Sequence, residues 1–562
     1  SYAGYVRNWK GNSEQTQPEM VFLPEFATTL PSSNFKFAKE RIADWGRNDP
    51  RGGGMEEIDV EMNVIRDFAR RVLLSEETFQ EDGNTFVNMF SGEWSGTSKL
   101  NKYDLSSMYF NYAGSIYSQN FPIIDIVMNT MLKQEESTQG RHFFRMFNGM
   151  GDDQRAAAYL NGKSFEQAVL DNTLSTEVFY EMMKLKGVYL RNYINSRLSS
   201  NEFKEFMAEF MKKYQFQEVN FTRLNSEFIR KFHFNLMDFI PNWYTINSTP
   251  RFIVKGVDAD QVEIGDYTKY IVKFQVYNPT NVEGVISVNV EEGGSMFPGG
   301  PRGRRGRAAQ MESKPAKNYI IEPQKYKEIR ILCDERPSNL TINTNISQNL
   351  PSTIMQNFAK VTTTTTDTVT GIFDSNAALF TFNPKEITVD NEDPGFRIIE
   401  SNQKNKLQSF FKKESEDKYK NLNFWMPPSK WTATIGVNYY GDYINSAVYK
   451  KSGSGSNKTE WTTQIQIPGF YEVFVYTSEL PMMGWRRRGS EEKKMQYYTV
   501  KHDDGEEEIS VETGRGRQGW MTLGSFYFSA GEAKITLSDK GSESNQIIFA
   551  DAVKWVYTNN NK

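Results

Sequence analysis

The chain has 562 residues, of which 38% are hydrophobic and 14% aromatic, and its formal net charge is −4. A chain of this length is expected to form roughly three or four domains. The small negative charge gives no reason to expect nucleic-acid binding, which calls for a basic surface patch or an excess of basic residues. No run of about 18 apolar residues occurs, so the sequence predicts no membrane-spanning helix. A single cysteine, Cys333, excludes an internal disulfide framework.

Near the N-terminus, the segment Arg66-Asp67-Phe68-Ala69-Arg70 has the frame of a zinc-protease helix without its metal ligands. In such a helix the motif H-E-x-x-H places two histidines one turn apart to bind zinc, while the glutamate moves a proton. Arg66 and Arg70 occupy the two histidine positions, and a protonated guanidinium has no lone pair for a metal. Taken alone, the five residues are more typical of an ordinary amphipathic helix.

Further segments of the N-terminal half match, in order, landmarks of the aminopeptidase-N-like gluzincin metallopeptidases. The matches are Phe22–Pro31 for an upstream strand and loop, Phe110–Ser118 for the third-ligand helix, Lys184–Gly187 for a Y-x-K-G segment, and Trp243–Phe252 for the terminal segment. Residues 15–252 therefore resemble the helical part of that family, as in bacterial members fused to membrane permeases. In this resemblance Tyr112 replaces the third ligand, a glutamate, and Lys184 replaces the tyrosine that stabilises the oxyanion.

The resemblance implies an inactive peptidase-like domain with no catalytic residue, no metal and no cofactor. Its degenerate positions are Arg66, Asp67, Arg70, Tyr112 and Lys184. A catalytic zinc needs three protein ligands, and none of the chain's three histidines lies within helical spacing of another. A hydrolase that keeps some activity through carboxylates such as Asp67 and Glu93 is an alternative.

Residues 56–247 have a predominantly helical pattern, which is clearest in Ser199–Tyr214. Ser199 and Glu202 match the capping box that starts a helix. Apolar residues then recur at helical spacing with charged residues opposite, which is the pattern of an amphipathic core helix. These apolar residues are Phe203, Phe206, Met207, Phe210, Met211 and Tyr214. We expect a second helix, with a weaker pattern, at Phe221–Phe234.

After Pro250 the hydrophobic period changes to two, which predicts strands. The expected strands are 251–257, 270–277, 284–290, 319–321 and 327–332. Short antiparallel strands at this spacing favour an immunoglobulin-like β-sandwich. The Thr-rich segment 362–366 fits an edge strand or a linker.

From about Val389 the chain carries a series of motifs that continues almost to its end. They are Tyr439–Tyr443, Glu460–Thr462, Pro468–Val475, Tyr498–Gly505, Gly519–Phe528 and Phe549–Trp555. Together they resemble the golvesin C-terminal or xanthan-lyase carbohydrate-binding-like domain. The resemblance implies a jelly-roll β-sandwich. Alternating apolar and polar residues in 524–528 and 534–537 independently support a sheet with one buried face.

A sugar-binding surface would use exposed aromatic rings that stack on pyranose faces, together with polar hydrogen-bonding groups. The candidates are Tyr439, Tyr440, Tyr443, Trp485 and Trp520. Trp461 and Trp555 are instead expected in the core, and Trp520 is a candidate for either role. His502 is expected to form a turn rather than to act as an acid–base catalyst.

The sequence thus predicts a multidomain α + β protein. Its expected parts are a mainly helical gluzincin-like domain at 1–247, an Ig-like β-sandwich at 248–385 and a jelly-roll β-sandwich at 386–562. Because the chain starts at Ser1 without an initiator Met, we expect a processed or excised part of something longer.

We expect a non-enzymatic binding or scaffold protein of a Gram-negative bacterial envelope, in the periplasm or on the cell surface. The expected partners are other envelope proteins, such as a membrane permease or an outer-membrane complex. A glycan is a further candidate partner, and no nucleic acid is expected. Carbohydrate binding through the C-terminal jelly roll is the alternative function.

Overall fold

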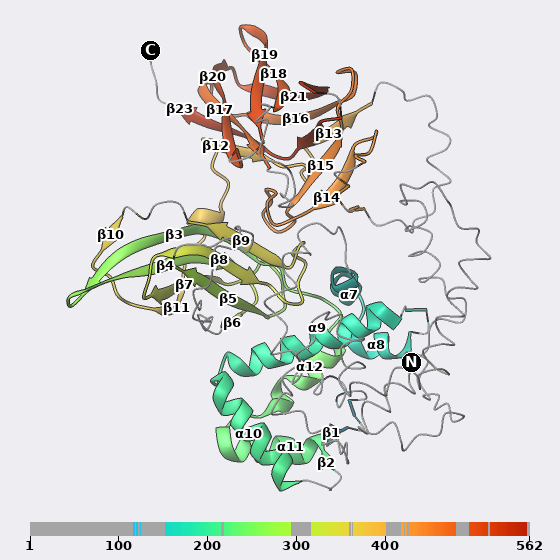
Figure 1. Cartoon of the computed structure of the whole chain (residues 1–562), viewed down its shortest axis with the longest axis vertical. Coiled ribbons are helices and arrows are strands. Elements are labelled where there is room, and N and C mark those ends of the chain that lie inside the picture. Colours follow the sequence, from blue (N-terminus) through green and yellow to red (C-terminus); the bar gives the residue numbers. More distant parts are fainter. Residues whose placement is uncertain are drawn as a thin grey trace, which may run out of the picture. The chain divides into compact units, whose positions relative to one another are not determined.

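The computed structural model (Figure 1) has two compact units, and the main boundary between them along the chain falls between Ser248 and Thr249. It describes residues 116–118, 120–121, 124, 127, 152–171, 173–174, 176–214, 219–293, 316–358, 361, 363–400, 418–420, 422–423, 426–478, 494–514, 517–543 and 545–558. Arg66, Asp67, Arg70, Tyr112 and Trp485, which the sequence singled out, lie outside the described residues.

The described part of the first unit is mainly helical and includes the helices from Arg155 to Thr245. Its elements are β1 (Ile116–Tyr117), α7 (Asp152–Leu160, which enters the unit at Arg155), α8 (Phe165–Leu170), α9 (Thr176–Asn195), α10 (Ser200–Lys213), β2 (Val219–Asn220), α11 (Phe221–Phe232), η4 (Leu236–Asp238) and α12 (Ile240–Thr245). The two short strands, β1 and β2, pair in parallel.

Helix α10 begins as its sequence predicts. The backbone N–H of Glu202 donates to Ser199 Oγ at 3.2 Å, and the Ser199 N–H donates to Glu202 Oε2 at 2.9 Å. Its apolar face is buried, and the Phe206 ring meets Phe228 of α11 edge-on at 5.2 Å between centroids. The predicted helix at 221–234 is also present, and ends two residues earlier, at Phe232.

The second unit starts with two sheets whose inner faces share one hydrophobic core. One sheet has the order β10-β3-β4-β7-β11 and the other β6-β5-β8-β9. Their strands are β3 (Ile253–Ile264), β4 (Tyr267–Tyr277), β5 (Gly284–Glu292), β6 (Lys317–Ile321), β7 (Tyr326–Cys333), β8 (Pro337–Asn343), β9 (Thr353–Asn357), β10 (Thr364–Thr365) and β11 (Gly371–Asp374). The core between them includes Phe252, Phe274 and Ile342. All five predicted strands are therefore confirmed, and Thr364–Thr365 of the Thr-rich segment form an edge strand.

The later part of the second unit contains three more sheets. Their orders are β12-β23-β17-β20, β13-β16-β21-β18-β19 and β14-β15-β22. The connecting segment after β11 includes η5 (Ala378–Phe380). The strands are β12 (Glu386–Val389), β13 (Phe396–Ile399), β14 (Thr432–Ile435), β15 (Ser446–Lys451), β16 (Lys458–Ile465), β17 (Gly469–Thr477), β18 (Lys494–His502), β19 (Gly505–Thr513), β20 (Gly519–Phe528), β21 (Gly531–Gly541), β22 (Ile547–Ala550) and β23 (Val553–Thr558).

The first two of these sheets pack face to face around a common core. Tyr471 and Trp555 of one sheet and Trp461 and Tyr498 of the other belong to a single buried cluster. The prediction that Trp461 and Trp555 fill the core is therefore confirmed, since both are at most 1% exposed. The described part of the protein is thus mostly β, with several sheets that form sandwiches, and helices make up a smaller fraction of its residues.

Candidate functional site

The sheet β12-β23-β17-β20 has one face in the core and an opposite face, which we call the outer face. Side chains alternate across a strand, so β17 divides cleanly between the two. Tyr471, Val473 and Val475 are buried in the core. The outer face of β17 carries Phe470, Glu472, Phe474 and Tyr476, all of them partly or well exposed. The residues of the neighbouring strands on this face include Trp520, Thr522 and Tyr527 of β20 and Lys554 of β23.

Strand register places two pairs of aromatic rings on the outer face. Phe470 stands opposite Tyr527, and Tyr476 stands opposite Trp520. The Phe470 and Tyr527 rings are 5.4 Å apart at 77°, and those of Tyr476 and Trp520 are 5.3 Å apart at 80°. Such edge-to-face pairs are preferred by the quadrupoles of the rings and hold both side chains in one orientation. Phe470 and Tyr527 are each 37% exposed, so this pair is open to a ligand.

Lysine 554 stands between the aromatic rings of the outer face. Its Nζ lies 4.6 Å from the centroid of Trp520 and 5.6 Å from that of Phe474. It also lies 3.4 Å from Glu386 Oε1 on β12. Beside it, Thr522 Oγ1 donates to Glu472 Oε1 over a long 3.4 Å. The face therefore combines apolar ring surfaces with an amine, a hydroxyl and a carboxylate at its surface.

Tyr440 extends the Tyr476–Trp520 pair from the segment between β14 and β15. Its ring lies 5.1 Å from Trp520 and 5.7 Å from Tyr476. Burial, and then the nearby Asp442 carboxylate, raises the pKa of Tyr440, and burial raises the pKa of Tyr476 to about 12. Both phenols therefore keep their protons at ordinary pH and retain an O–H donor.

The buried carboxyl of Asp551 positions Tyr440. The backbone N–H of Tyr440 donates to the two oxygens of Asp551 at 3.2 and 3.3 Å, and Ser478 Oγ donates to Oδ2 at 3.2 Å. Asp551 is only 2% exposed. Burial raises the pKa of this carboxyl well above its usual range, and the charge of Asp390 raises it further. A single buried group thus ties the segment that carries Tyr440 to the end of β17.

The structure separates the aromatic residues that the sequence proposed together. Trp520 and Tyr440 meet on the outer face, as described above. Tyr439, one residue earlier, is 8% exposed and packs on Phe549 at 5.9 Å in a separate core cluster. The expectation that Tyr439 is an exposed ligand contact is therefore corrected: its ring is used in packing. Tyr443 stacks on the guanidinium of Arg251, whose central carbon lies 4.0 Å from the ring centroid.

Four aromatic residues of the outer face were not among the sequence candidates. They are Phe470, Phe474, Tyr476 and Tyr527. The available signal was the spacing of two between Val473 and Val475, because a strand that buries both leaves Phe470, Phe474 and Tyr476 on the opposite face. The partner strand, however, lies more than forty residues further along the chain, and only the register of the sheet shows which of its rings face them.

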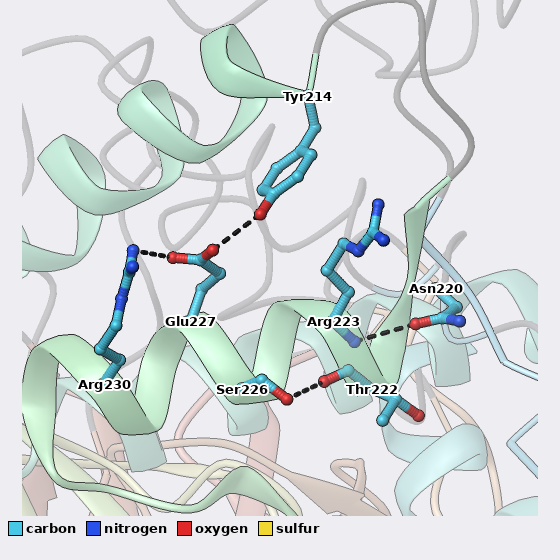
Figure 2. Close-up of a pocket in the computed structure, with 7 residues that line it drawn as sticks. All are labelled: Tyr214, Asn220, Thr222, Arg223, Ser226, Glu227 and Arg230. Atoms are coloured by element: carbon cyan, nitrogen blue, oxygen red, sulfur yellow. Dashed lines mark hydrogen bonds and ion pairs between the residues drawn. The ribbon is translucent and has the colours of Figure 1, made fainter.

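A hollow of about 440 Å³ lies on the first unit along the exposed side of α11 (Figure 2). Its lining residues are Tyr214, Asn220, Thr222, Arg223, Ser226, Glu227 and Arg230. Figure 2 shows Tyr214 and Arg230 both directed at Glu227, which also accepts from Lys213 Nζ at 2.7 Å. Hydrogen bonds from Lys213 and Tyr214 hold the pKa of Glu227 below its usual range. Because these groups satisfy one another, the hollow is a hydrogen-bonded helix surface, and we assign it no ligand.

The remaining sequence candidate of the helical half, Lys184, lies in the middle of α9. Its Nζ is 2.5 Å from Glu181 Oε1, one helical turn away. The neighbouring Lys186 is buried, and its Nζ donates to the Trp243 carbonyl at 2.5 Å. Among the described residues, no group of three His, Cys, Asp or Glu side chains is arranged to hold a metal ion. Within the same residues, no helix has the length and apolarity that crossing a membrane requires.

Comparison with known proteins supports the expectation for the C-terminal part. The family model of the golvesin C-terminal domain matches residues 421–557, which include every residue that we place on the outer face. The predicted resemblance of this part to that family is therefore confirmed. No finding supports the aminopeptidase-N-like resemblance of the N-terminal half. No curated protein matches the chain.

Several solved structures show weak likeness to the chain. A xanthan lyase from Paenibacillus is 14% identical, with a TM-score of 0.22; the match covers 55% of this chain and 26% of the lyase. A two-domain protein of unknown function from Bacteroides fragilis is 10% identical (TM-score 0.14), and the match covers 55% of this chain and 94% of that protein. An exo-β-1,3-galactanase from Phanerochaete chrysosporium is 8% identical (TM-score 0.19), with coverage of 54% and 68%. Likeness at this level carries no argument about function.

Proposed function

We propose that the protein binds carbohydrate through the outer face of the β12-β23-β17-β20 sheet, as a component of a bacterial envelope outside the cytoplasm. The observation that carries the proposal is the presence of two ordered aromatic pairs on this face, Phe470–Tyr527 and Tyr476–Trp520. The golvesin-type match at 421–557 supports it, because it includes both aromatic pairs. In this proposal the protein binds its ligand without cleaving it.

The chemistry of the outer face fits a sugar ring. The C–H side of a pyranose is apolar and packs on an aromatic ring, which removes apolar surface of both partners from water. The sugar hydroxyls at its rim need hydrogen-bonding partners, and Thr522, Glu472 and Lys554 supply a donor and acceptor set beside the rings. Aromatic side chains that are already held by their neighbours lose little conformational entropy when they bind.

Three finer expectations belong to the same proposal. Residues 386–562 form a golvesin-type jelly roll, and residues 248–385 form an Ig-like sandwich that joins it to the helical part. The partners are other proteins of the envelope. The peptidase-like scaffold expected from residues 1–247 gains no support from the geometry of Lys184 or from the comparisons, and it stays a prediction.

The test is binding of the full chain to a panel of purified polysaccharides that includes xanthan, a β-1,3-galactan and soluble cellulose derivatives. Calorimetry should detect binding to at least one of them, and Trp520→Ala should weaken it by about tenfold or more, as for a central aromatic contact. Tyr267→Ala is the matched control, because Tyr267 is 73% exposed but lies on β4 in the other sandwich. Equal affinity of wild type and Trp520→Ala, at unchanged melting temperature, would overturn the assignment of this face.

A further inference from the structure

We infer that the ligand is an extended glycan chain that lies along β17 and contacts both aromatic pairs at once. This inference rests on the proposed function and specifies the class of carbohydrate. Its basis is the spacing of the two pairs, which lie at opposite ends of the same two strands. The residues that carry it are Phe470, Tyr527, Tyr476 and Trp520, with Glu472, Phe474 and Thr522 between them.

The distance between the pairs exceeds the size of one sugar. Phe470 and Tyr476 are six residues apart on β17. At about 3.3 Å per residue, they are separated by about 20 Å along the strand. A monosaccharide can therefore contact one pair only, whereas a chain of several sugars can span the distance between them.

The residues between the two pairs continue the same surface. Phe474 adds a third ring on β17, with Lys554 Nζ 5.6 Å from its centroid. Glu472 and Thr522 are joined by a hydrogen bond and both reach the surface. A sugar chain in contact with both pairs would thus cross a strip that offers both aromatic rings and hydrogen-bonding groups.

Simultaneous contact at both ends has a measurable consequence. When two weak contacts belong to one ligand, the second forms at a high effective concentration, so affinity rises steeply once the ligand can span both. Loss of either aromatic pair then strongly lowers the affinity for a long ligand. A short ligand contacts one pair at a time and can still bind at the remaining pair, so the affinity for it falls little.

The experiment compares a disaccharide with an octasaccharide of the polysaccharide that binds in the panel. Wild-type protein should bind the octasaccharide at least about tenfold more tightly. The double variant Phe470→Ala/Tyr527→Ala should lose about tenfold for the octasaccharide and less than about threefold for the disaccharide. Tyr267→Ala again serves as the control, and melting temperatures identify any variant that fails to fold.

The outcomes distinguish this inference from the proposal on which it rests. If Trp520→Ala abolishes binding while Phe470→Ala/Tyr527→Ala binds the octasaccharide like wild type, the face binds sugar at one end only and the inference is overturned. Equal affinity for the disaccharide and the octasaccharide overturns it as well. If no member of the panel binds, the proposed function itself fails, and the inference fails with it.

Discussion

Replacement of Lys450 by methionine is expected to destabilise the C-terminal sandwich by about 3–5 kcal/mol, because it leaves a buried carboxylate without its countercharge. Lys450 of β15 and Asp539 of β21 form an ion pair in which the side chains are 4% and 0% exposed. Methionine keeps most of the length and apolar volume of lysine, so the change removes mainly the charge.

Asp539 also accepts hydrogen bonds from the segment between β15 and β16. The Gly455 N–H donates to its Oδ1 at 2.7 Å, and Asn457 Nδ2 donates to its Oδ2 at 2.9 Å. Burial alone would raise the pKa of Asp539, but the bonds from Lys450 and Asn457, together with the charge of Lys450, outweigh burial and hold it below the usual range. The neutral donors of Gly455 and Asn457 cannot replace a full countercharge. The expected loss of unfolding free energy is therefore that of a broken buried ion pair rather than that of one hydrogen bond.

The pH dependence has a definite sign. A carboxyl with a lowered folded-state pKa contributes stability above its unfolded-state pKa, and the contribution is lost as pH falls through the folded-state pKa. In Lys450→Met the pKa of Asp539 should rise, so that Asp539 takes up a proton at a higher pH than in the wild type. The difference in unfolding free energy between the two proteins should therefore shrink as the solution is acidified from neutral pH.

Urea unfolding, followed by tryptophan fluorescence at neutral and mildly acidic pH, measures this difference. Lys451→Met is the matched control, because Lys451 is the next residue of β15 and is exposed. It should change stability by less than about 0.5 kcal/mol. A loss below about 1 kcal/mol in Lys450→Met, or a difference that grows on acidification, would refute the reasoning about a buried charge.

Two further predictions concern single positions. Burial lowers the pKa of Lys186 to about 7, so above that pH the unfolded chain binds more protons than the folded chain. The unfolding free energy of the helical unit should therefore rise with pH, by up to about 1.4 kcal/mol per pH unit. Thermal unfolding from neutral to mildly alkaline pH should show this rise in the wild type and not in Lys186→Met. Parallel slopes for the two proteins would contradict this. Gly441→Ala should lower both the melting temperature and the affinity for polysaccharide. Gly441 has φ +154°, and a Cβ there would lie 1.9 Å from the Ile444 carbonyl oxygen, so the alanine should displace the segment that holds Tyr440. A melting temperature and an affinity equal to those of the wild type in calorimetry would refute this.

The sequence by itself determined the local structure of the described part. Ser199 and Glu202 predicted the start of α10 because a capping box satisfies backbone groups within four residues of each other. The alternation at 524–528 and 534–537 and the strands from Ile253 onward followed in the same way, since a period of two reports which residues share a sheet face. The golvesin-type motifs were also visible, because they lie within single strands and turns.

Only the tertiary structure decided which aromatic residues form a surface. Tyr439 and Tyr440 are adjacent in sequence, yet one packs in a core cluster and the other meets Trp520 on the outer face. Tyr476 and Trp520 are far apart in sequence, and sheet register brings their rings to 5.3 Å. Composition and spacing cannot distinguish these cases, because a ring lowers its free energy equally well by burial in a core or by packing on a ligand. The pairing of distant strands determines which of the two is available to it.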